Sequence, residues 1–108
     1  LDSIQARLTL ERAAKARGIP MIHAAIAGCC GRVMTVYPQD GGLEKLYRLP
    51  QKKGAENELG NPAATPALAA ALQVQEAVKV LTASGETLRN KMLCFDTEWN
   101  LFEIMEVG

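Results

Sequence analysis

The chain has 108 residues, 48% of them hydrophobic, and its 12 basic and 12 acidic side chains cancel to a formal net charge of zero. This composition excludes a wholly disordered chain, and the balanced charge predicts no nucleic-acid partner and no attraction to an anionic membrane. The length suits a single domain, or a fragment of one, over residues 1–108. Three cysteines without a Cys-x-x-Cys spacing favour a cytoplasmic setting over a disulfide framework.

The first expected element is a helix that ends before residue 18. Asp2 or Ser3 supplies an oxygen that can cap the first turn, and the residues up to Ala16 favour helix. Gly18 and Pro20 end this helix, because glycine suits a left-handed C-terminal residue and proline cannot continue the hydrogen-bond ladder.

Two strands are expected next, at residues 21–26 and 32–37. The first is a short apolar run of the kind buried on both faces of a parallel sheet. The second is rich in β-branched residues and ends at Pro38. Gly28 and Gly31 bracket a short turn between them, so the two strands should pair antiparallel.

Residues 38–62 are rich in glycine, proline and charge, and predict a long crossover-type loop that is either functional or disordered. At most one short strand, Leu46–Leu49, is expected inside it. No residue of this loop is a cysteine.

The last part of the chain predicts a helix followed by a hairpin. Thr65 can cap a helix that has Pro66 at its first position and continues to Thr82. It is apolar almost all round, which predicts burial, but its charged and amide side chains argue against a membrane span. Strands at 91–95 and 101–107 follow, joined by a turn. The whole order is α-β-β-loop-α-β-β, an α/β fold with a mixed sheet in two or three layers.

Few residues point to chemistry by themselves. His23, the only histidine, lies in an expected strand and is interpreted as a core or edge residue. Cys29 and Cys30 are too close in sequence to form a good disulfide, and Cys94 should be a small core residue; the sequence does not decide whether any of the three has a redox role. Asp2 is either a helix cap or a magnesium ligand, and its spacing alone favours the cap.

Several segments, in order, resemble the C-terminal half of the ThiF/MoeB/HesA family, the bacterial relatives of ubiquitin-activating enzymes. "LDSIQAR" resembles its Asp-Asn-x-x-x-Arg stretch, with Asp2 and Arg7 at the matching places. "RGIPMIHAAIAGCCGRVMTVYP" resembles its strand–turn–strand segment. "LQVQEAVKVLTASGETLRNKMLCFD" also matches, and its helical part, Leu72 to Leu81, is the most specific match; "NLFEIMEV" resembles the closing strand.

The resemblance implies the C-terminal half of a Rossmann-like ThiF fold and an ATP- and magnesium-dependent adenylyltransferase. Such enzymes attach AMP to the C-terminal glycine of a ubiquitin-like sulfur-carrier protein and are commonly homodimers. Asp2 would match the aspartate of the magnesium and ATP site, with Arg7 as a weaker candidate. The nucleotide-binding loop lies upstream of Leu1 in the family, so this chain should not catalyse adenylation alone.

Two departures from the family pattern qualify this expectation. Leu46 and Leu49 stand where zinc-containing members have a Cys-x-x-Cys pair, and no second pair follows, so no zinc is expected. The missing loop cysteine puts a thioester or persulfide step in doubt. The alternative is therefore a non-catalytic dimerisation or interaction module derived from the family. The particular carrier and pathway stay open.

Overall fold

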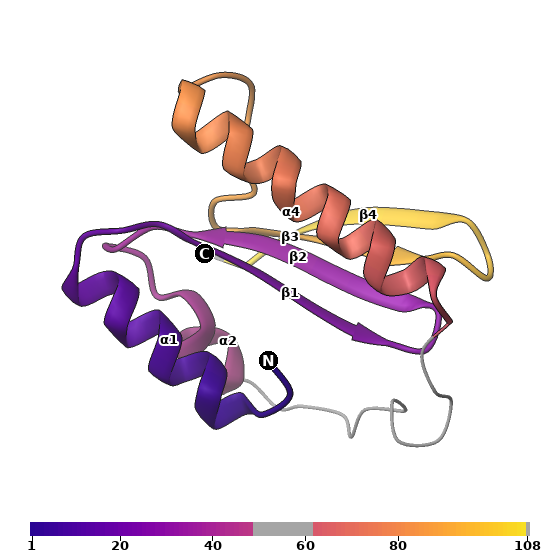
Figure 1. The fold of residues 1–108 in the computed structure, drawn as a ribbon, viewed down its shortest axis with the longest axis horizontal. Helices are drawn as coiled ribbons and strands as arrows, with labels where there is room; N and C mark the ends of the chain where they lie inside the picture. Colours follow the sequence, from indigo (N-terminus) through magenta and orange to yellow (C-terminus); the bar gives the residue numbers. More distant parts are fainter. Residues whose placement is uncertain (49–61, 108) are drawn as a thin grey trace.

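The computed structural model describes residues 1–48 and 62–107. Their core is a four-stranded sheet in the order β1-β2-β3-β4, with helices on both faces and therefore three layers (Figure 1). Helices α1 and α2 lie on one face, whereas α4 crosses the other. The elements are α1 (Ile4–Ala16), β1 (Met21–Ala27), β2 (Cys30–Val36), α2 (Gly42–Arg48), α4 (Ala64–Thr82), β3 (Lys91–Asp96) and β4 (Leu101–Glu106).

The elements with strong local signals are confirmed. Ser3, rather than Asp2, caps α1, since its Oγ accepts from the Ala6 backbone N–H at 3.0 Å. Strands β1 and β2 pair antiparallel from Met21↔Val36 onward, as the short turn between them predicts. Strands β3 and β4 form the expected antiparallel hairpin.

The first strand lies between helices on both faces of the sheet, as its apolar run predicts, but the surrounding sheet is antiparallel. β1 resembles a strand of a parallel sheet in its sequence, but it lies at one edge of an antiparallel sheet. Parallel pairing within the described residues is confined to an isolated bridge between Thr35 and Arg89. An apolar run indicates that a strand is buried, but it does not indicate the direction of the neighbouring strands. Helices on both faces of an antiparallel sheet therefore account for the same run of apolar residues.

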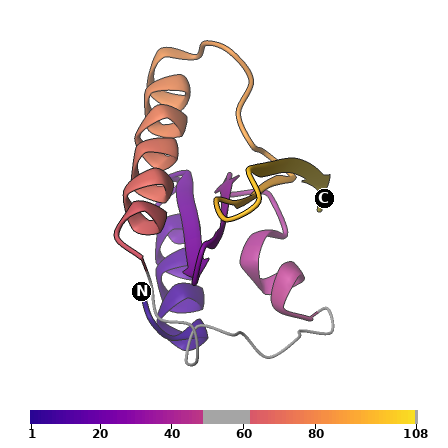
Figure 2. The same ribbon diagram turned by 90° about the vertical axis from the view of Figure 1, so that its right-hand side faces the viewer.

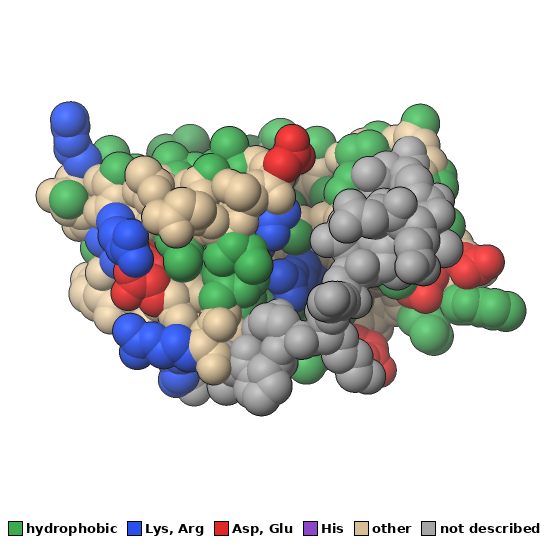
Figure 3. All heavy atoms as spheres, turned by 90° about the horizontal axis from the view of Figure 1, so that it is seen from below, with side chains coloured by type: hydrophobic (Ala, Val, Ile, Leu, Met, Phe, Trp, Pro, Cys, Tyr) green, Lys and Arg blue, Asp and Glu red, His purple; other side chains and the backbone are tan. Residues whose placement is uncertain are grey.

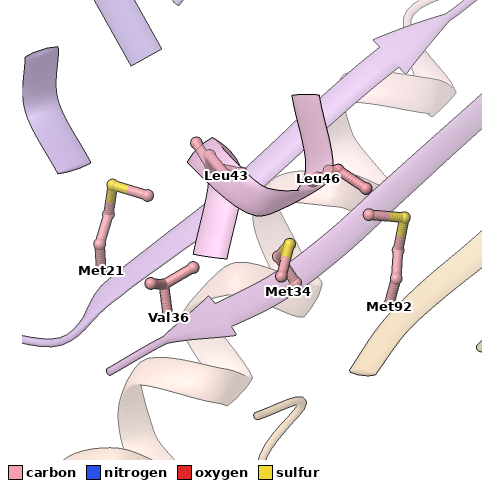
Figure 4. Packing of buried hydrophobic residues seen from close by; sticks show 6 residues of the cluster. All are labelled: Met21, Met34, Val36, Leu43, Leu46 and Met92. Atoms are coloured by element: carbon pink, nitrogen blue, oxygen red, sulfur yellow. The ribbon is translucent and has the colours of Figure 1, made fainter. Parts of the chain in front are cut away.

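Helix α2 replaces the short strand expected at Leu46–Leu49. Leu43 and Leu46, three positions apart, share one helical face and enter the main core cluster together with Met21, Met34, Val36 and Met92 (Figure 4). Leu43 is completely buried and Leu46 nearly so. Leu46 thus anchors this segment by apolar contact, while Leu49 and the rest of the expected loop to residue 61 lie outside the described residues.

Helix α4 begins earlier than expected. Ala63 occupies its N-cap position without a side-chain hydrogen bond, and Thr65 lies inside the first turn, fully buried. The prediction of Thr65 as a cap is therefore wrong, because packing of the first turn outweighs the capping preference. The prediction that the whole helix is buried is also wrong, since one side exposes Val74, Val78 and Leu81.

The layers do not cover the sheet evenly. Figure 2 shows α4 and α2 on opposite sides of the strands. Helix α4 contacts β1 and β2, whereas all six residues of β4 are exposed. The hairpin therefore extends beyond the helices that cover the other half of the sheet.

Candidate functional site

Asp2 lies at the start of the chain, directly before the cap of α1, and is exposed. Its carboxylate makes no hydrogen bond or ion pair with the described residues, so its oxygens are open to a ligand. Carboxylate oxygens are suited to a hard cation such as magnesium. One carboxylate is not a complete metal site, and the described residues contain no cluster of three or more histidine, cysteine, aspartate or glutamate side chains that would form one.

Arg7, on the second turn of α1, ties this end of the chain to α2. Its Nε donates to the Leu1 carbonyl at 2.9 Å, and its Nη1 donates to the Tyr47 hydroxyl at 3.0 Å. The first bond fixes the backbone next to Asp2. The structure therefore places both residues of the family stretch at the same end of α1.

A second arginine reaches the same tyrosine from the sheet. Arg32 of β2 donates from Nη2 to the Tyr47 hydroxyl at 3.4 Å, and its guanidinium lies 5.8 Å from the centre of the Tyr47 ring. Neither Arg7 nor Arg32 forms an ion pair with a carboxylate in residues 1–48 and 62–107. Two cations thus converge on the Tyr47 hydroxyl.

His23 lies beside these arginines on β1. Its side chain is 5% exposed, which confirms the prediction of a core or edge histidine, and its Nε2 has no hydrogen-bond partner. Burial, followed by the positive charges of Arg32, Arg7 and the N-terminal amine, lowers the pKa of His23 to about 3. The imidazole is therefore neutral at physiological pH.

Two cavities flank the sheet. One of about 210 Å³ lies at β1 and is lined by Arg7, His23, Gln73 of α4 and apolar side chains of α1, β1 and α2. The other, of about 290 Å³, lies between α4 and β3–β4 and contains two lysines and two glutamates. Figure 3 shows the face of α1 and α2, where Lys and Arg side chains (blue) lie among hydrophobic ones (green).

Two buried glutamates hold the helices in place. Glu11 of α1 is completely buried and accepts from the backbone N–H groups of Leu43 and Glu44 at the start of α2. Glu76 of α4 accepts from the Thr35 hydroxyl and from the Leu88 N–H. The sequence analysis predicted neither role. The sequence feature that could have indicated them is a charged residue on the side of a helix that otherwise faces the core.

The thiols of Cys30 and Cys94 show no sign of activation. Burial, then the nearby Asp96 carboxylate, raises the pKa of Cys30, and burial also raises the pKa of Cys94. Both thiols therefore stay protonated at neutral pH. Cys94 donates weakly to the sulfur of Met105 at 3.7 Å, which is a packing contact.

The sequence matches the ThiF family over residues 1–108. The chain belongs to the ThiF family. The match confirms the resemblance found in the sequence and supports an adenylyltransferase-like fold. No curated protein matches the chain.

The fold is also similar to a solved structure, "Crystal Structure of SeMet PaaA", with a TM-score of 0.70 and 14% sequence identity. The similarity covers 95% of this ThiF-family chain and 33% of that chain, so the present sequence spans about a third of the length of the protein it resembles. At this identity the likeness concerns the fold alone. The α/β architecture expected from the sequence is confirmed. Within the described residues of this ThiF-family chain, no helix combines the length and apolar character needed to cross a membrane.

Proposed function

We propose that this ThiF-family chain is the C-terminal part of an ATP-dependent adenylyltransferase that activates the C-terminal glycine of a ubiquitin-like sulfur-carrier protein in the cytoplasm. The family match along the whole sequence is the observation that carries this proposal. The open carboxylate of Asp2, next to a backbone that Arg7 holds in place, supports it.

In the proposed reaction the carrier's terminal carboxylate oxygen attacks the α-phosphorus of ATP. A phosphorus–oxygen bond forms, the bond from the α-phosphorus to the bridging oxygen breaks, and pyrophosphate leaves with the electron pair. The product is an acyl-adenylate, which is then open to sulfur transfer. Magnesium, when bound, offsets the negative charge of the phosphates.

Asp2 would supply one ligand to that magnesium, and its exposure and lack of any other partner fit this role. The described residues hold no group of three or more histidine, cysteine, aspartate or glutamate side chains that would complete a metal site around it. The remaining ligands and the nucleotide-binding loop would come from sequence upstream of Leu1. We therefore propose that these 108 residues are inactive alone, and that no zinc takes part.

A specific observation favours a second candidate function, in which the chain is a non-catalytic dimerisation or interaction module. The outer side of α4 and both faces of β4 expose large apolar side chains: Val74, Val78, Leu81, Leu101, Phe102, Ile104 and Met105. Large apolar side chains exposed in such number favour a contact with another protein. A homodimer through this surface is compatible with either function, and absence of nucleotide binding would distinguish the module from the enzyme.

The test is ATP–pyrophosphate exchange by the full-length protein with a carrier protein that ends in glycine. We expect exchange that depends on the carrier and falls at least about 100-fold in Asp2→Asn, because an amide is a weak magnesium ligand. Glu98→Gln, a neutralised exposed carboxylate in the β3–β4 turn, is the matched control and should retain full exchange. Lack of both exchange and nucleotide binding by the wild-type protein would overturn the enzyme proposal and leave the module.

A further inference from the structure

We propose that the cavity of about 210 Å³ at β1 is a binding site for a small anionic group, a carboxylate or a phosphate, with Arg7 and His23 as its hydrogen-bond donors. This goes beyond the proposed function, which assigns nucleotide chemistry to Asp2. Asp2 does not line the cavity, and the test below uses neither ATP nor a carrier protein.

The first argument is the unsatisfied nitrogen of His23. A buried polar atom without a partner costs about 1–3 kcal/mol, so such atoms are uncommon in folded proteins. The Nε2 of His23 is buried, lacks a partner, and belongs to a residue that lines the cavity. A neutral imidazole with its proton on Nε2 offers one hydrogen bond to an acceptor placed there.

The second argument is the uncompensated charge. A guanidinium has five N–H groups, and the bonds described for Arg7 use only its Nε and one Nη1 direction. Arg32 adds a second positive charge behind Tyr47. With no carboxylate paired to either arginine in the described part of the chain, the potential here favours an anion.

The other cavity provides a direct contrast. There Lys91 pairs with Glu86 and Lys79 pairs with Glu76, so each charge is already balanced within the protein. The two cavities differ little in size, at about 210 and 290 Å³. The β1 cavity is the one whose positive groups still require an external acceptor.

The side chains that line the β1 cavity limit the class of ligand that it can bind. Leu10, Met21 and Leu43 add apolar side chains to the lining of the cavity. Its volume of about 210 Å³ admits a phosphate or a carboxylate on a short aliphatic group. The carboxylate and the phosphate share the required chemistry, which is a negative charge on oxygens that accept from N–H groups.

The experiment is an NMR titration of the full-length protein, following the His23 ring signal with inorganic phosphate and, separately, with acetate. The signal is assigned as the one absent in His23→Gln. Sodium chloride at equal ionic strength controls for screening. We expect a saturable change of the His23 signal with at least one of the two anions, and the stronger of them identifies the ligand class.

Two variants test the donors. Arg7→Gln should weaken the binding at least about tenfold, since it removes a charge-assisted hydrogen bond to the anion. Arg12→Gln is the matched control on the same helix. Because Arg12 is exposed and bonds to Glu44 instead, the affinity of this variant for the anion should change less than about twofold. If Arg7→Gln does not fold, the wild-type protein still provides a test, because a bound anion should raise the pKa of His23 from about 3 by at least about one unit.

The proposal is overturned if neither phosphate nor acetate causes a saturable change beyond that of chloride. It is also overturned if Arg12→Gln weakens binding as much as Arg7→Gln does, since that result would indicate attraction to the general charge of α1. ATP–pyrophosphate exchange is measured separately, so failure of the anion site leaves the adenylyltransferase proposal intact, and the reverse also holds.

Discussion

The two halves of the sheet differ in how they are covered. β1 and β2 lie between α4 on one face and the core cluster of α1 and α2 on the other, whereas every residue of β4 is exposed. The covered half contains the buried polar groups Glu11, Glu76 and His23. The open half contains a stacked aromatic pair, Phe95 and Phe102, with ring centres 6.1 Å apart.

This difference separates two kinds of residue. In the covered half a polar side chain is under strong constraint, because each missing hydrogen bond leaves a group that water cannot reach. On β4, where all six residues are exposed, an apolar side chain contributes little to folding and is free to serve a contact with another protein. Mutations should therefore be costly for stability in the first half and costly for association in the second.

The largest effect is expected at Gly42, the first residue of α2. Its φ of +58° disfavours any side chain, and an added Cβ would meet the Glu11 carboxylate and Val36. We expect Gly42→Ala to lower the free energy of unfolding by about 4 kcal/mol, since strain adds to the loss of the Glu11 hydrogen bonds. Urea denaturation measures it.

Gly18 is the matched control for that substitution. It has a similar φ of +67°, but nothing lies within 4 Å of an added Cβ. Gly18→Ala should therefore cost only the strain, about 1–2 kcal/mol. Equal losses in the two variants would show that the contact with Glu11 is unimportant.

The next effect is expected at Glu76. Replacement by alanine leaves the Leu88 N–H and the Thr35 hydroxyl buried without their acceptor, and should cost about 3 kcal/mol. Glu86→Ala, which removes an exposed carboxylate, should cost much less. A small loss in Glu76→Ala, measured by urea denaturation, would contradict the constraint assigned to the covered half.

The Glu76 carboxylate should also make the free energy of unfolding depend on pH. Burial alone would raise its pKa, but hydrogen bonds from Lys79, the Leu88 N–H and Thr35 outweigh burial and lower it. Its contribution to stability is therefore complete above the pKa of the unfolded chain, near 4.5, and is lost as the pH falls below that value. Glu76→Gln should reduce this loss below pH 4.5.

The buried His23 should also make the free energy of unfolding depend on pH, in a range above that of Glu76. Because the folded state lowers its pKa from 6.5 to about 3, the unfolded chain binds a proton first as the pH falls. Stability is thus complete above pH 6.5 and declines below it, by about 2 kcal/mol at pH 5. Denaturation of the wild type at pH 7.5 and pH 5 measures the decline, and His23→Gln should remove most of it. An unchanged decline in that variant would assign it to other groups.

The smallest effect on folding is expected in the open half. Ile104 is 63% exposed, so Ile104→Lys should change the free energy of unfolding of the subunit by less than about 0.5 kcal/mol. If a second copy covers this surface, the same change should convert dimer to monomer in analytical ultracentrifugation, because it buries an unpaired charge. Arg48→Glu, an exposed change on α2, is the control and should leave the oligomeric state unchanged.

The sequence predicted those parts of the fold whose signals are local. Helix α1 has its cap at Ser3 and its stop at Gly18, and each hairpin has a short polar or glycine-containing turn. Helix α2 was missed because its two core leucines are a pattern too short to separate helix from strand. The start of α4 was misplaced because a good capping residue, Thr65, is buried by packing instead.

For the candidate sites, the sequence by itself determined the family and, through it, the interest of Asp2 and Arg7. These residues lie in one continuous stretch, so a motif can reveal them. Only the tertiary structure decided that Arg7 and Arg32 converge on Tyr47 beside an unpaired His23. Those side chains come from four different elements, and no local periodicity connects them. The sequence also does not reveal that the helices cover the sheet unevenly. That cover depends on where α4 crosses the strands and not on the composition of any one strand.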